Sequence, residues 1–273
     1  MDASLEHDKR YRLDLRVLRF RGDKKRDEPA LLARDLLAKG RSDEALELTS
    51  AALEDDPSDT DLLLVHGIAL AKSGQLATAQ LALTRAAKED PEWVEPWRLL
   101  AEVLWQRGKH ARALQVARRG LAVDPGDESL SRIQKSASLE LRARSYLFAP
   151  NDEEPAMLAQ ELLSDNRADL AFEVTRTALL EELDDVDLLV VHARAAIAMR
   201  DLDEAINALS MATYGAADWP EVWKLLATAH EQKGEPDRAR QAAFEGLCNN
   251  PGDVELKRLH ARLEGQGETL VTM

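Results

Sequence analysis

Apolar residues recur three and four positions apart along most of the chain. Two neighbouring segments show the pattern, with Leu99, Leu100, Val103 and Leu104 in one and Ala113, Leu114, Ala117 and Leu121 in the next. This is the spacing of an amphipathic helix, in which such residues share one face. The pattern therefore predicts an all-α protein built from short helices that each turn one face to a core.

Glycine and proline divide these helices into pairs. Each recurs at a spacing of 34 residues, at Gly40, Gly74 and Gly108 and at Pro57, Pro91 and Pro125. Glycine stands where the first helix must end and the chain reverse, whereas proline follows the second helix, which it cannot continue. Each period is therefore predicted to be a helical hairpin.

The second half of the chain repeats the first. Residues 28–133 align on residues 154–259 without a gap, always at a step of 126 and with about 40% identity. In the second copy, Asn166 and Arg200 replace two of the glycines, and Leu183 and Ala217 replace two of the prolines. The chain is predicted to be a tandem duplication of a module with three hairpins.

A 34-residue hairpin with these marks resembles the tetratricopeptide repeat family. The third hairpin carries the signature best, through Trp97, Leu100, Ala101, Gly108, Ala113 and Pro125. The resemblance implies an α-solenoid of antiparallel helical hairpins, wound as a right-handed superhelix of about six repeats plus capping helices. The capping helices are expected at residues 128–144 and 254–263.

Three regions follow from this organisation. They are a basic N-terminal arm at residues 1–27, a first three-repeat module at residues 28–150 and a second module at residues 151–273. A linker at residues 146–151 begins with Tyr146, Leu147 and Phe148. Because exposed clusters of aromatic residues are costly, we expect this linker to lock the modules into one solenoid rather than let them flex.

Charge narrows the class of partner. The net charge is -14, although the first 27 residues carry +3. The acidic remainder disfavours nucleic acid and anionic membranes, so a protein or peptide partner is predicted. Three possibilities stay open for the arm: it folds back on the first hairpin, adds to a partner as a strand, or contacts an anionic surface.

The sequence lacks the motifs of catalysis and of metal binding. No Gly-rich loop precedes Lys-Ser or Lys-Thr, no Gly-x-Ser-x-Gly turn occurs, and Cys248 is the single cysteine. His66 and His192 end two equivalent apolar runs and lie too far apart in the repeat to share a metal, so each is expected to be a structural histidine held by a hydrogen bond. We predict no catalytic residue, no metal, no cofactor and no enzymatic activity.

The location is predicted to be cytoplasmic. The N-terminus lacks a basic start followed by an apolar stretch, and no apolar run approaches the ~20 residues of a membrane-spanning helix. Insertion into a membrane is therefore not expected.

The resemblance also implies where a partner binds, because the first helix of each hairpin lines a groove in this family. Matching columns place these residues in the groove of the first module: Arg34, Leu37, Leu64, Ile68, Lys72, Arg98, Glu102 and Trp105. The corresponding set in the second module is Gln160, Leu163, Val190, Arg194, Ile197, Lys224, Thr228 and Glu231. Several of these residues differ between the copies, so the grooves are expected to select different ligands. The first set suits an acidic peptide with an apolar anchor.

These features predict a non-enzymatic adaptor or scaffold. Three alternatives stay open: a secretion-type or assembly chaperone for a specific client, a peptide-sensing regulator, and an accessory subunit of a separate enzyme. Some members of the family grip a C-terminal carboxylate with a clamp of lysine and asparagine. That clamp is missing here, because its positions are taken by Ala30, Arg34, Val65, Glu95 and Leu99.

Overall fold

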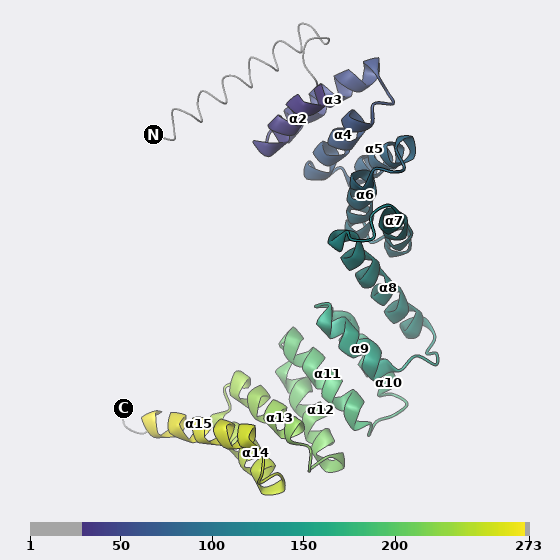
Figure 1. Cartoon of the computed structure of the whole chain (residues 1–273). Helices are drawn as coiled ribbons and strands as arrows, with labels where there is room; N and C mark the ends of the chain where they lie inside the picture. The colour runs from purple at the N-terminus through teal and green to yellow at the C-terminus, as the bar shows by residue number, and fades with distance from the viewer. Residues whose placement is uncertain (1–28, 271–273) are drawn as a thin grey trace. The chain divides into compact units, whose positions relative to one another are not determined.

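The computed structural model describes residues 29–270 of the chain, with side chains through residue 265. All secondary structure in this range is α-helical, and Figure 1 shows the helices following one another as antiparallel pairs. In chain order they are α2 Pro29–Ala38, α3 Ser42–Asp55, α4 Thr60–Lys72, α5 Leu76–Glu89, α6 Val94–Gln106, α7 His110–Val123, α8 Glu128–Phe148, α9 Pro155–Ser164, α10 Ala168–Ala178, α11 Val186–Met199, α12 Leu202–Gly215, α13 Pro220–Lys233, α14 Pro236–Asn249 and α15 Val254–Leu270. The predicted all-α repeat fold is confirmed, and the basic arm at residues 1–27 lies outside the described residues.

The described residues divide into two compact units, with the boundary between Ser138 and Leu139. The hairpins α2–α3, α4–α5 and α6–α7 belong to the first unit, and α9–α10, α11–α12 and α13–α14 belong to the second. Within a unit each hairpin helix packs on the next, and the first helices of successive hairpins also touch, as α2 does with α4 and α9 with α11. The boundary between the units falls inside α8, whereas the sequence pattern places the module boundary after residue 150.

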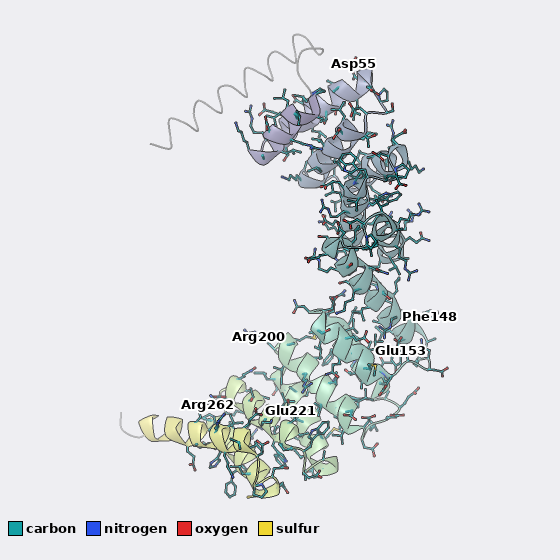
Figure 2. The ribbon with its side chains drawn as sticks, viewed as in Figure 1. Asp55, Phe148, Glu153, Arg200, Glu221 and Arg262 are labelled. Atoms are coloured by element: carbon teal, nitrogen blue, oxygen red, sulfur yellow. The ribbon has the colours of Figure 1, made fainter. Side chains whose placement is uncertain are left out.

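Every hairpin turns on one residue with a positive φ. In the glycine turns φ is 73° at Gly40, 79° at Gly74, 68° at Gly108 and 83° at Gly234. The second copy reaches the same conformation without glycine, at Asn166 with φ 60° and at Arg200 with φ 64°; Figure 2 labels Arg200 at the end of α11. A left-handed residue with a Cβ costs roughly 1–2 kcal/mol. The second copy therefore keeps the turn geometry at these two positions although glycine, the residue that favours it, is absent.

Two helix starts in each copy are capped in the same way. Asp59 and Asp185 accept a hydrogen bond from the backbone N–H three residues on, at 2.9 and 3.0 Å. Asp127 and Asp253 do so at the starts of α8 and α15, at 2.8 and 2.7 Å. Such caps satisfy N–H groups that have no partner inside the helix, so the duplicated aspartates define where duplicated helices begin.

Small residues let the paired helices cross closely. The predicted column is fully buried at Ala45, Ala79, Ala113, Ala171, Ala205 and Ala239. At two further positions a methyl group fits only if a neighbour shifts, because a Cβ on Gly120 would lie 2.5 Å from Leu130 Cδ1, and one on Gly246 2.6 Å from Trp223 Cβ. Close packing of this kind fixes the skeleton that the two copies share.

The structure corrects the predicted linker. The helix expected at residues 128–144 continues to Phe148, because Leu139, Ala143 and Tyr146 are buried in one cluster with residues of α9 and α10. In the same region the buried carboxylate of Glu140 is paired with Arg167. The second half of α8 is therefore a packed helix of the second unit rather than a linker. The other added helix, expected to end at residue 263, continues as α15 to Leu270.

Candidate functional site

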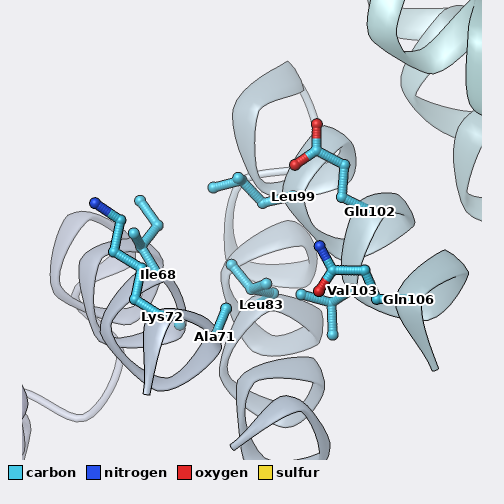
Figure 3. Close-up of a pocket in the computed structure, with 9 residues that line it drawn as sticks. Ile68, Ala71, Lys72, Leu83, Leu99, Glu102, Val103 and Gln106 are labelled. Carbon is cyan, nitrogen blue, oxygen red and sulfur yellow. The ribbon is translucent and has the colours of Figure 1, made fainter. Parts of the chain in front are cut away.

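A hollow of about 220 Å³ lies between α4 and α6 in the first unit. Figure 3 shows Ile68 and Lys72 on one wall, Leu99 and Glu102 on the opposite wall, and Leu83 of α5 between them. The complete lining is Gly67, Ile68, Ala71, Lys72, Leu83, Leu99, Glu102, Val103 and Gln106. Because small-molecule sites usually occupy about 300–1,000 Å³, this hollow better fits one large side chain of a protein segment.

One wall of the hollow carries a hydrogen-bond donor, Lys72, and the other carries an acceptor, Glu102. The ammonium of Lys72 donates to the carbonyl of Leu37 over 3.4 Å, which is a long hydrogen bond. Burial raises the pKa of the Glu102 carboxyl from its ordinary value of 4.5, although the nearby charge of Arg98 opposes the shift. A half-buried carboxylate of this kind is stabilised by an N–H donor from a ligand. The hollow therefore offers a donor on one side, an acceptor on the other and an apolar floor.

Three of the residues predicted for the groove of the first unit meet in this hollow: Ile68, Lys72 and Glu102. Two others do not face it. Leu37 and Leu64 belong to the hydrophobic core, with 6% and 2% of their surface exposed. They hold hairpins together, and we therefore leave them out of the candidate site.

The remaining predicted residues of the first unit do not line the hollow and have partners of their own. Arg34 donates to Asp61 at 3.0 Å, which joins α2 to α4. Arg98 is paired with Glu95 one turn away on α6. The ring of Trp105 packs edge-on against a histidine of α7, with 4.7 Å between centroids. Arg34 and Arg98 thus have their charges matched within the chain, which weakens the case for an acidic ligand.

Sequence reasoning missed Leu99, Val103 and Gln106, which form the α6 wall of the hollow together with Glu102. The two apolar residues stand at helical spacing and are expected in a core, because apolar residues in that pattern usually are. They line a hollow because α4 and α6 leave space above Leu83. The hydrophobic pattern carries no signal for such a space.

The matching face of the second unit is joined by ion pairs. Arg194 occupies the position of Ile68 and donates to Glu221 over 3.0 Å, which links α11 to α13; Figure 2 labels Glu221 near the start of α13. Lys224 pairs with Glu255 at 2.6 Å and links α13 to α15. Hydrogen bonding to Glu255 raises the pKa of Lys224. The predicted residues Arg194 and Lys224 thus connect neighbouring helices of the repeat.

The two equivalent histidines are structural, as predicted. Nδ1 of His66 lies 2.9 Å from Thr49 Oγ1, and Nδ1 of His192 lies 2.8 Å from Thr175 Oγ1. In the second copy Nε2 of His192 also lies 3.2 Å from a carboxylate oxygen of Glu204. Burial lowers the pKa of both histidines.

Two further features of residues 29–265 concern metals and membranes. No group of three or more His, Cys, Asp or Glu side chains is arranged to hold a metal ion in this range. No helix there combines the length and the hydropathy of a membrane-spanning segment.

Comparison with known proteins identifies the repeats. Models described as tetratricopeptide repeat match residues 31–79 and 64–128, residues 162–228, and residues 220–263. No curated protein matches the chain.

Solved structures similar to the chain have low sequence identity to it. A tetratricopeptide repeat protein from Parabacteroides merdae ATCC 43184 is 16% identical with a TM-score of 0.43, over 85% of this chain and 96% of that one. The TPR2AB domain of yeast Sti1, in a complex with pHSP90, is 17% identical with a TM-score of 0.41, over 85% and 95%. The APC/C hetero-tetramer Cut9-Hcn1 gives 19% identity and a TM-score of 0.39, over 89% of this chain but only 50% of that one. Because repeat models match most of both units, the chain belongs to the tetratricopeptide repeat family.

Proposed function

We propose that the chain is a non-enzymatic adaptor that holds a segment of a partner protein across α4 and α6 of the first unit. Tetratricopeptide repeat proteins generally mediate protein–protein interactions, and their fold is typically an interaction module rather than a catalyst. The observation that supports the proposal most is the hollow that brings Ile68, Lys72 and Glu102 together over an apolar floor. The cytoplasmic location and the exclusion of nucleic acid stay predictions from the sequence.

The hollow favours an extended segment with one large apolar side chain. That side chain enters between Ile68 and Leu99 and covers Leu83. An extended backbone presents an N–H and a C=O at each residue, so it can donate to Glu102 and accept from Lys72 at once. Lys72 is hydrogen-bonded to a carbonyl rather than paired with a carboxylate, so it is the cation of this face best placed for a ligand.

Site-specific photo-crosslinking in the native host tests this proposal. A photoreactive phenylalanine analogue replaces Leu99 in the full chain, and in a control it replaces Arg112, an exposed residue of α7. We expect a covalent product with a partner protein from position 99 and none from position 112. Equal labelling from both positions would mean that contact is not directed to the hollow.

A second variant separates binding from folding. Ile68→Arg introduces the residue that the second copy carries at the equivalent position, so the repeat is expected to fold. The larger, charged side chain fills the space between α4 and α6, and the crosslink from position 99 should disappear. Arg194→Ile, the reciprocal change in the second unit, should leave the crosslink intact. Retention of the product in Ile68→Arg would contradict the proposal.

A further inference from the structure

The second unit carries an apolar hollow on a different face, formed by α10, α11 and α12. Its volume is about 200 Å³, and its apolar lining is Leu179, Leu180, Leu183, Leu189, Ala208 and Met211. Three of these side chains are largely exposed, with 78% for Leu180, 64% for Leu183 and 47% for Met211. Exposed apolar side chains that gather around one hollow, rather than standing singly, are typical of interaction sites.

This hollow is separate from the face that corresponds to the site in the first unit. It is reached from the side of α11 that carries Leu189 and His192. Arg194, two residues further on, pairs with Glu221 of α13 instead. Residues two apart on a helix do not share a face, so the hollow and the ion pair lie on different sides of α11.

The first copy shows that the fold does not require these apolar residues. At a step of 126, Leu180, Leu183 and Met211 correspond to Glu54, Pro57 and Arg85. In the first unit the guanidinium of Arg85 donates to the carbonyl of Pro57 at 2.7 Å and spans the equivalent place. The same hairpins therefore form with a polar set, and the apolar set is a property of the second copy.

The surroundings of the hollow are acidic. Residues 177–193 contain five Asp or Glu and no Lys or Arg, and Glu181, Glu182 and Asp184 are exposed beside the two leucines of the turn. Glu204 of α12 also lines the hollow. The lining also contains one arginine, Arg176, whose charge is paired with a glutamate of α10. A ligand that fits must bring positive charge together with apolar side chains.

We propose that the hollow on α10, α11 and α12 docks a basic amphipathic helix of a second partner protein. Its apolar face would enter between Leu180, Leu183 and Met211, and its lysines or arginines would face the acidic turn. A second copy that packs through the same hollow fits less well, because two acidic surfaces would then face each other. The docking is independent of the segment proposed for the first unit.

Defined peptides test the chemistry. The probe is a fluorescein-labelled synthetic helix with two leucines one helical turn apart, flanked by lysines, and its binding to the full chain is followed by anisotropy. In one control peptide glutamates replace the lysines, and in another serines replace the leucines. We expect the basic apolar peptide to bind, and each control to bind about tenfold more weakly or not at all. Equal binding of the glutamate peptide would overturn the proposal.

Variants of the chain locate the contact. Leu180→Glu combined with Met211→Arg introduces residues of the first copy and should weaken binding of the basic peptide about tenfold or more. Leu81→Glu removes an exposed leucine of the first unit and should leave binding of the basic peptide unchanged. Undiminished binding to the double variant would overturn the proposal. So would a full-chain dimer that dissociates in the double variant, because the occupant would then be a second copy.

Discussion

The two units share one skeleton and differ in which face is open. In the first unit the face of α4 and α6 holds an apolar hollow, while Arg85 spans the place between α5 and the turn at Pro57. In the second unit the arrangement is reversed. Arg194 and Glu221 join α11 to α13, and the hollow lies on α10, α11 and α12.

This difference shows which positions are constrained by the repeat fold and which can differ between the two copies. The buried alanines, the glycines at helix crossings and the capping aspartates persist at a step of 126, because each is set by packing or by backbone hydrogen bonds. Side chains that face solvent carry no such constraint. A single arginine is enough to span a face in one copy, and its replacement by isoleucine or methionine leaves the equivalent face open in the other.

The largest expected effect tests the shared skeleton. Gly246→Ala places a Cβ 2.6 Å from Trp223 Cβ, an atom that cannot move without the helix, so overpacking of about 3 kcal/mol exceeds the gain of about 1 kcal/mol in helix propensity. Gly120→Ala first meets Leu130 Cδ1, at the end of a side chain, and should therefore cost less than Gly246→Ala. The loss of stability in each variant is measured by urea unfolding, with hydrogen exchange used to monitor each unit separately. Equal losses would mean that the two crossings are packed alike.

A transplant of the hollow tests the difference between the faces. Ile68→Arg should weaken binding of the partner segment about tenfold, because it removes the space for its apolar side chain. Conversely, binding should appear in the second unit when its three equivalent residues are replaced together, as Arg194→Ile, Ala198→Lys and Thr228→Glu. Titration calorimetry with the crosslinked segment measures both. Failure of the triple variant in a folded chain would show that these three positions do not define the site.

The turns offer a smaller effect on stability. Arg200 holds φ at 64°, so Arg200→Gly should stabilise the second unit by about 1 kcal/mol. Asn166→Gly should gain less, because asparagine tolerates the left-handed region better than arginine. The midpoint of urea unfolding checks the order of the two gains. If Arg200→Gly destabilises the chain, the side chain of Arg200 stabilises the fold by more than its left-handed backbone conformation costs.

The smallest expected effect depends on pH. Burial raises the pKa of Glu102 above 4.5, so the folded state favours the neutral carboxyl more than the unfolded state does. Its charge therefore lowers stability above the folded-state pKa, and this cost is absent below pH 4.5. Glu102→Gln should stabilise the first unit at pH 7 by less than about 1 kcal/mol, because solvent screens a half-buried group. The gain should vanish as the pH falls towards 4. A gain that grows at low pH would contradict the burial of this carboxylate.

The sequence predicts the fold far better than the site. Gly74, Pro91 and Ala79 recur at 34 residues because every hairpin must turn, end and cross its partner in the same way. The extent of α8 escaped prediction, because Tyr146 is held in the helix by contacts with α9 that no local pattern encodes. At the site, the columns of the repeat pointed to Ile68 and Lys72, but equally to Leu37, which is buried. The position of a residue in the repeat predicts which face of its helix it occupies. Whether its side chain is exposed depends on how the neighbouring helix packs.

Hydrogen exchange of the full chain, with and without the crosslinked partner segment, tests the proposed site most directly. Binding in the hollow should slow exchange in α4 and α6, and leave the equivalent α11 and α13 unchanged, because Arg194 and Glu221 already span that face. Equal slowing in both pairs of helices, or slowing confined to α5 and α7, would contradict a partner site in the first unit alone.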